Sequence, residues 1–121
     1  METMTEEQVV EQFGPIRYYL IGISKMTDGR RPGWGRVWHH SQSISCYSKE
    51  ELSAKLEELE VRKTRMNKLT EIGKPIPCYA VRWAVWPIVR GFGSSGRRHA
   101  AFGIGRHVEL KPIFYREHSF E

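Results

Sequence analysis

Apolar and polar positions repeat along this chain with two different periods, and these periods predict where its helices and strands lie. A capping box, Thr-Glu-Glu-Gln at residues 5–8, precedes an apolar pair and predicts a short helix over residues 6–13. Gly14 and Pro15 are expected to end that helix. Residues 16–24 carry apolar side chains at both odd and even positions, a pattern typical of an interior strand.

A loop and a second strand are expected next. Residues 25–36 are rich in glycine and arginine, and they contain two turn signals, Asp-Gly and Pro-Gly. Residues 36–47 then place Trp38, Ile44 and Cys46 at even positions and a mainly polar set at odd positions. We therefore expect a strand with one polar face, antiparallel to the first strand.

The longest regular pattern along the chain is that of a helix. Ser-Lys-Glu-Glu at residues 48–51 is a second capping box, and apolar residues at helical spacing continue from Lys49 to about Ile72. Gly73 is expected to close this helix. Acidic residues fill its first half and basic residues its second half, which complements the helix dipole. The basic half is a candidate secondary cationic surface, formed by Arg62, Lys63, Arg65 and Lys68.

Two further strands complete the expected fold. Residues 78–86 alternate between a large apolar set and a smaller mixed set, and Pro87 indicates an edge, a bulge or the end of that strand. Residues 102–111 alternate again and predict a half-buried strand, whereas residues 112–121 form a tail too aromatic to be simply disordered. The order α-β-β-α-β-β predicts one compact α+β domain over residues 1–121, with a four-stranded, mainly antiparallel sheet and the long helix across one face.

Composition narrows the class of protein. With 121 residues and 40% apolar side chains, the chain is large enough to bury one core. Its two cysteines, Cys46 and Cys78, are too few for a disulfide framework and predict reduced, buried thiols. No apolar run approaches the length of a membrane span, and the N-terminus is acidic where a signal peptide would be basic. We therefore expect a soluble, cytoplasmic protein in a reducing compartment.

The net charge of +5 is unevenly distributed along the chain. Residues 12–49 and 72–108 together hold twelve lysines and arginines against the single Asp28, whereas most acids lie in the two helices. Such basic segments favour acidic partners, namely nucleic acid, anionic lipid or an acidic protein.

Two loops combine glycine, arginine and an aromatic residue, at residues 29–36 and 90–99. Glycines permit the positive φ that lets amides converge on an anion, arginines supply forked donors, and aromatic rings can stack on bases. The alternative is a pair of solvated loops whose arginines only keep the protein soluble. The candidate phosphate-binding residues are Arg30, Arg31, Arg36, Arg90, Arg97 and Arg98, and the candidate stacking residues are Trp34 and Phe92.

Residues 91–96 match the dinucleotide-binding pattern G-x-G-x-x-G, but the helix and the acid that this fingerprint requires do not follow it. The adjacent His39 and His40 would point to opposite faces of a strand, and no C-x-x-C accompanies them. The basic half of the chain also lacks the carboxylates of a metal-dependent nuclease. We therefore expect no catalytic residues, no metal and no cofactor.

The leading hypothesis is a small, basic, non-enzymatic protein that contacts DNA or RNA through both loops. This single-site hypothesis requires the two loops to share one end of the sheet, which the sequence does not decide. One alternative is a protein-binding effector or inhibitor, of the kind that phages and mobile elements encode, which occupies the surface of an acidic or nucleic-acid-handling protein. A further alternative is capture of a small nucleotide under the second loop, at residues 90–99, which we call the glycine-rich loop.

Overall fold

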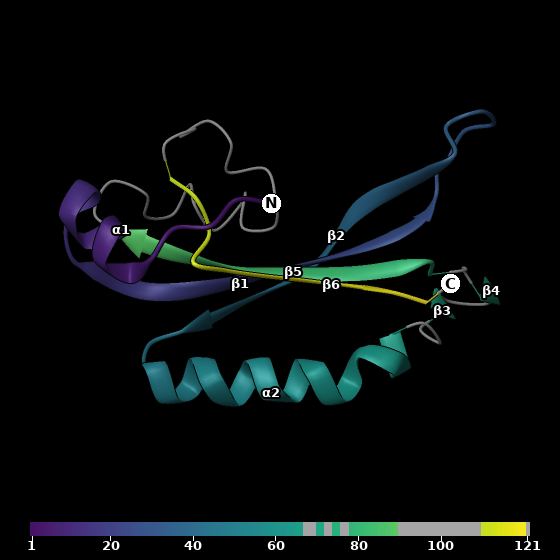
Figure 1. Ribbon diagram of the computed structural model, residues 1–121. Helices are drawn as coiled ribbons and strands as arrows, with labels where there is room; N and C mark the ends of the chain where they lie inside the picture. Colours follow the sequence, from purple (N-terminus) through teal and green to yellow (C-terminus); the bar gives the residue numbers. More distant parts are fainter. Residues whose placement is uncertain (67–69, 72–73, 76–77, 90–109, 121) are drawn as a thin grey trace.

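A computed structural model describes residues 1–66, 70–71, 74–75, 78–89 and 110–120. Its elements follow the order expected from the sequence, an α+β fold with two helices and a four-stranded antiparallel sheet (Figure 1). The elements are α1 (Glu6–Phe13), β1 (Ile16–Asp28), β2 (Arg36–Cys46), α2 (Lys49–Met66), β3 (Thr70–Glu71), β4 (Lys74–Pro75), β5 (Ala80–Val89) and β6 (Phe114–Ser119).

The strand order in the main sheet is β2-β1-β5-β6, and every neighbouring pair is antiparallel. β1 and β5 are therefore interior strands, as the two apolar faces of residues 16–24 predict. The short strands β3 and β4 pair only with each other.

The two helices lie on opposite faces of the sheet (Figure 1). α2 runs along one face, where Leu52 and Leu59 pack against a buried cluster of the central strands that includes Trp83. α1 covers one end of the other face, where Val9 packs against Leu20 and Trp86. We call these the α2 face and the α1 face.

Both helices begin where their capping boxes predict. The Thr5 hydroxyl accepts a hydrogen bond from the Gln8 backbone N–H, and the Gln8 side chain accepts one from the Thr5 N–H. At α2 the Ser48 hydroxyl accepts from the Glu51 N–H at 3.1 Å, while the Glu51 carboxylate accepts from the N–H of Tyr47 rather than of Ser48. These local bonds fix the helix starts independently of the sheet.

Two predicted boundaries are wrong. α2 ends at Met66 instead of near residue 72, because Thr70 and Glu71 leave the helix and pair with β4. β1 runs on to Asp28, although residues 25–28 have the composition of a loop. Pairing explains the difference in β1, because residues 25–28 all pair with β2 and Lys25 and Met26 also pair with β5. These non-local bonds override local turn propensity.

The fourth strand comes from the tail of the chain. β6 lies at Phe114–Ser119, whereas residues 102–109 of the expected strand lie outside the described residues. β6 is an edge strand, and an edge strand tolerates charged residues such as those in this tail. Pro87 is accommodated inside β5 because β6 pairs only with Ala80–Val85, so Pro87 lies beyond the end of that neighbour.

Candidate nucleic-acid interface

A tight turn shapes the tip of the hairpin that joins β1 to β2. The Trp34 backbone N–H donates to the Arg31 carbonyl at 3.1 Å, which encloses Pro32 and Gly33. Proline followed by a glycine at φ +87° is the signature of a type II turn. The Gly29 N–H donates to a carbonyl across the hairpin, which closes the base of this turn.

Trp34 is held at the tip while much of its ring remains accessible. Its side chain is 55% exposed. The indole packs over Gly29 so closely that a Cβ on that glycine would lie 2.5 Å from the Trp34 Cβ. The Arg31 guanidinium lies 5.5 Å from the centre of the Trp34 ring. The tip therefore presents an aromatic ring and a cation side by side, the pair that a base and its phosphate require.

A second arginine–aromatic pair lies beside the turn, where β1 ends and β2 begins. The Arg36 guanidinium lies 3.7 Å from the centre of the Tyr79 ring, and the Tyr79 hydroxyl donates to both carboxylate oxygens of Asp28, at 3.1 and 3.2 Å. Partial burial raises the pKa of Tyr79, and the Asp28 carboxylate raises it further. Asp28, the single acid of this hairpin, is thus engaged by neighbouring side chains.

A third pair, Arg82 on Trp38, lies further along the sheet, with the guanidinium 4.1 Å from the ring centre. A β-bulge explains why these residues meet. β1 pairs Ile23 with Gln42 but Ser24 with His40, which leaves Ser41 unpaired. The extra residue reverses the alternation of β2.

The bulge corrects the predicted faces of β2. Cys46 pairs with Tyr19 and lies on the α2 face, and Ile44 pairs with Ile21 on that same face. Trp38 pairs with Met26, an even-numbered β1 residue, and therefore lies on the α1 face. The prediction that Trp38 shares a face with Ile44 and Cys46 is wrong.

Within the described residues, three arginines lie over aromatic rings, one at the hairpin tip and two that bring β2 residues together with residues 79 and 82. Register places Arg36, Trp38 and Arg82 on the α1 face, since their β1 partners are residues 28, 26 and 24. We call the whole set the Arg/aromatic surface; it comprises Arg31, Trp34, Arg36, Tyr79, Trp38 and Arg82.

The candidate residues of the first predicted loop lie at the hairpin tip and at the start of β2. Four of the predicted site residues are exposed at the hairpin, namely Arg30, Arg31, Trp34 and Arg36. Sequence reasoning missed Trp38, Tyr79 and Arg82. Arg82 carried a usable signal, since a charged residue inside an otherwise apolar interior strand requires a partner on its own face. Trp38 and Tyr79 carried no such signal, because their partners are set by contacts between distant strands and not by local alternation.

The second predicted loop is anchored at the other end of the sheet. Its site residues, Arg90, Phe92, Arg97 and Arg98, lie outside the described residues. Val89, which precedes them, pairs with Ile16 at the start of β1, whereas the hairpin tip follows Asp28 at the end of β1. Leu110, which follows the loop, packs in the core beneath α1. The two loops therefore do not leave the sheet from the same end.

The secondary basic surface on α2 is engaged in ion pairs of its own. Arg62 lies 3.8 Å from Glu58, and Lys63 lies 2.9 Å from Glu60, which also accepts from the Arg116 Nε at 2.9 Å. Hydrogen bonds from Lys63 and Arg116 lower the pKa of Glu60. α2 also lies on the face opposite Arg82 and Trp38. The side chain of Arg65, and all of Lys68, lie outside the described residues.

Burial shifts the pKa values of two cysteines and one lysine among the described residues. Cys46 and Cys78 are free and buried, and burial raises the pKa of both thiols. Burial also lowers the pKa of Lys25, which lies near Cys78. Among the side chains that the structure describes, no three His, Cys, Asp or Glu residues come close enough to hold a metal ion.

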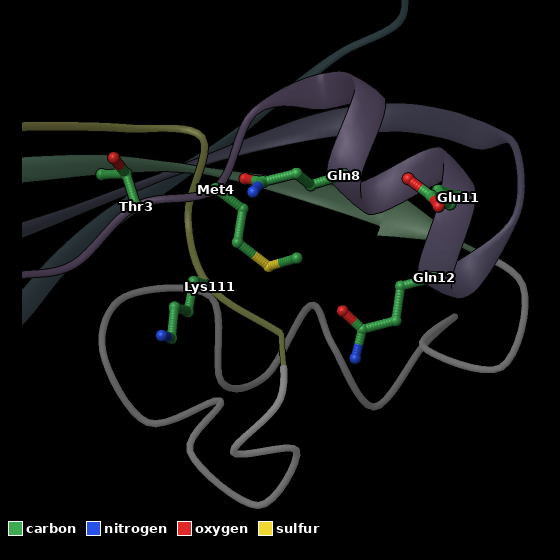
Figure 2. A pocket seen from close by; sticks show the side chains of 6 residues that line it. All are labelled: Thr3, Met4, Gln8, Glu11, Gln12 and Lys111. Atoms are coloured by element: carbon green, nitrogen blue, oxygen red, sulfur yellow. The ribbon is translucent and has the colours of Figure 1, made fainter.

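A cavity of about 530 Å³ lies beside α1 (Figure 2). Its described lining comes from the N-terminal arm, from α1 and from Lys111, which forms an ion pair with Glu2. None of the residues of the Arg/aromatic surface is among its described lining residues. The lining residues are Thr3, Met4, Gln8, Glu11, Gln12 and Lys111.

Of the helices in the described ranges, none combines the length and the apolar character that crossing a membrane requires. Comparison of the chain with protein-family models, with curated proteins and with solved structures found no match.

Proposed function

We propose that this chain is a non-enzymatic nucleic-acid-binding protein that uses its Arg/aromatic surface as the contact site. One observation carries the proposal: three arginine–aromatic pairs lie on the hairpin and the adjoining residues 79–82, and the hairpin ends in the exposed ring of Trp34. Proteins that bind nucleic acid without reading its sequence combine a basic groove with aromatic stacking platforms. In this protein the hairpin and the strand next to it carry both the basic residues and the aromatic rings.

Each part of the tip has a role in this proposal. Arg30 and Arg31 are exposed and contact phosphates, because their guanidinium groups are permanently charged and donate forked hydrogen bonds. Trp34 stacks on a base. Its packing over Gly29 holds the ring in place before binding, which lowers the entropy lost on association. The hairpin residues 28–36 carry three arginines and one aspartate, so their local charge is positive.

Titration of labelled DNA and RNA at several salt concentrations tests this proposal. Each phosphate contact contributes a slope of roughly −0.7 to −0.9 in a plot of log K against log salt concentration. Replacing both Arg30 and Arg31 with alanine is expected to reduce the magnitude of that slope by roughly 1.4 to 1.8. Arg17→Ala, which removes an exposed arginine near the start of β1, is the matched control and leaves the slope unchanged. Absence of binding at low salt, or binding without a salt slope, contradicts the proposal.

A protein-binding effector or inhibitor is the competing candidate, favoured by the projection of this hairpin beyond the rest of the sheet (Figure 1). Tryptophan and arginine are also the residues that dominate protein–protein interfaces. A nuclease-treated pull-down that recovers one stoichiometric protein with the wild type, but not with Trp34→Ala, supports this candidate. The third candidate, small-nucleotide capture under the glycine-rich loop, falls on residues 90–109, outside the described residues.

A further inference from the structure

The α1 face of the hairpin continues along β2 well beyond Trp38. Because of the bulge, His40, Ser43 and Ser45 pair with even-numbered β1 residues and lie on the same face as Trp38. His40 and Ser43 are exposed, and the His40 Nε2 lies 3.4 Å from the Ser43 hydroxyl. The polar face expected on β2 is therefore joined to the Arg/aromatic surface.

An aromatic residue stands at the far end of this face. Tyr47 follows the last residue of β2 and is 68% exposed, and its ring contacts the ring of Tyr18 at a centroid distance of 5.4 Å. One side of the Tyr47 ring is thus supported by its neighbour. Trp34 at the tip has the same arrangement, since Gly29 supports it while much of its ring is accessible.

The dimensions and charge of the face between these two rings suit an extended polyanion. β2 has 11 residues, which at about 3.3 Å per residue corresponds to a length of roughly 35 Å. On this face β2 carries Arg36 and His40, and the acid that pairs with Arg36, Asp28, accepts hydrogen bonds from Tyr79. Serine hydroxyls and arginines are among the common ligands of phosphate oxygens. β2 is also an edge strand, so the face is open along its outer side in the part of the chain that the structure describes.

We propose that this face is a track for single-stranded nucleic acid, which lies extended along β2 from Trp34 to Tyr47. The track consists of Trp34, Arg36, Trp38, His40, Ser43 and Tyr47. The inference rests on the proposed nucleic-acid function and specifies its ligand. Bases can stack on Trp34 and Tyr47 only when they are unstacked from their neighbours, a condition that a single strand meets and a duplex does not.

Oligonucleotides of increasing length, from about 3 to about 12 nucleotides, test the track because they span the usual range of single-strand site sizes. Affinity is expected to rise with length until both ends are occupied. Trp34→Ala is expected to weaken binding of every length by about tenfold, in the range for one stacked base. Tyr47→Ala is expected to weaken only the longer oligonucleotides, also by about tenfold. Tyr47→Phe keeps the ring and is expected to restore wild-type affinity.

Val61→Ala on α2 is the control variant, since Val61 is 71% exposed but lies outside the track. A wild-type protein that binds no nucleic acid overturns the proposed function itself. A wild-type protein that binds duplex as tightly as single strands overturns only the track. The track alone is also overturned if Trp34→Ala lowers the affinity while Tyr47→Ala leaves the affinity unchanged at every oligonucleotide length. Circular dichroism of each variant confirms that the fold is intact.

Discussion

The two faces of the sheet use the same residue types for different purposes. Trp83 on the α2 face is completely buried in a core of aliphatic side chains, whereas Trp34 at the hairpin tip is more than half exposed. The difference lies in what covers each ring, since side chains of α2 pack on the first, whereas Gly29 and Arg31 flank the second. A tryptophan therefore stabilises the fold at one site and is accessible to a ligand at the other.

Charges differ between the faces in the same way. Near α2, Glu60 links Lys63 to Arg116, so cations there neutralise acids of the same molecule. Along the hairpin, Arg31, Arg36 and Arg82 lie over aromatic rings. Stacking on a ring leaves a guanidinium its charge, and residues 28–36 of the hairpin hold three arginines and one aspartate.

The largest expected effect is on the free energy of unfolding, and it distinguishes Trp83 from Trp34. Trp83→Ala is expected to lower the free energy of unfolding by about 3–5 kcal/mol, because it removes a fully buried aromatic side chain. Trp34→Ala is expected to change that free energy by less than about 0.5 kcal/mol. Urea denaturation followed by circular dichroism measures both values. Equal losses in the two variants would show that Trp34 belongs to the core.

For the affinity for nucleic acid, the order of the two tryptophan variants is expected to be the reverse of their order in stability. Trp34→Ala should lower the affinity for single-stranded nucleic acid by about 1–3 kcal/mol, since one stacked base is lost. Trp34→Phe, which keeps an aromatic ring, should retain most of the affinity. Fluorescence anisotropy with a labelled oligonucleotide gives these values, with Val61→Ala as the control. An affinity unaffected by Trp34→Ala would leave the hairpin tip without a stacking role.

Gly29→Ala tests whether the placement of Trp34 matters, because the added Cβ would lie 2.5 Å from the Trp34 Cβ and must displace it. We expect a loss of about 1 kcal/mol in the free energy of unfolding and a weaker affinity, although every ligand-binding side chain is retained. Gly35→Ala is the matched control. It introduces a side chain at φ +67° with no atom within 4 Å, so it adds strain of about 1–2 kcal/mol without pushing on the ring. Equal affinities in the two variants would show that the position of the ring is unimportant.

The smallest expected effect concerns the ion pairs near α2. The folded-state pKa of Glu60 is lowered from its ordinary value of 4.5, so its carboxylate stabilises the fold above that value and loses this contribution as the pH falls through the lowered pKa. Glu60→Gln should therefore reduce the free energy of unfolding by less than about 1 kcal/mol near about pH 7. The difference from wild type should shrink as the pH falls below 4.5 and through the lowered pKa of Glu60. Urea denaturation at neutral and at acidic pH checks this, and a difference that persists in acid would point to packing rather than charge.

Elements defined by neighbouring residues were predictable from the sequence. The capping boxes at Thr5 and Ser48 place both helix starts, because each bond joins groups three or four residues apart. The two apolar faces of residues 16–24 identify an interior strand, since both faces of such a strand are buried. The Pro-Gly signal likewise marks the turn at the hairpin tip.

Features that depend on distant strands were not predictable in this way. The extension of β1 to Asp28 depends on pairing with β2, and the choice of Phe114–Ser119 as the fourth strand depends on pairing with β5. The bulge at Ser41 depends on the register between β1 and β2. A one-residue change of register moves every later side chain to the other face, so alternation within β2 alone could not place Trp38.

The sequence by itself determined the composition of the candidate site, a turn in which Arg30, Arg31 and Trp34 are close neighbours along the chain. Only the tertiary structure decided that Arg36, Trp38 and Arg82 continue that site along the α1 face. It also decided that the second loop is anchored at the opposite end of β1. The physical reason is that residue type is a local property, whereas the face and the end of a sheet at which a side chain lies are set by hydrogen bonds between strands far apart in sequence.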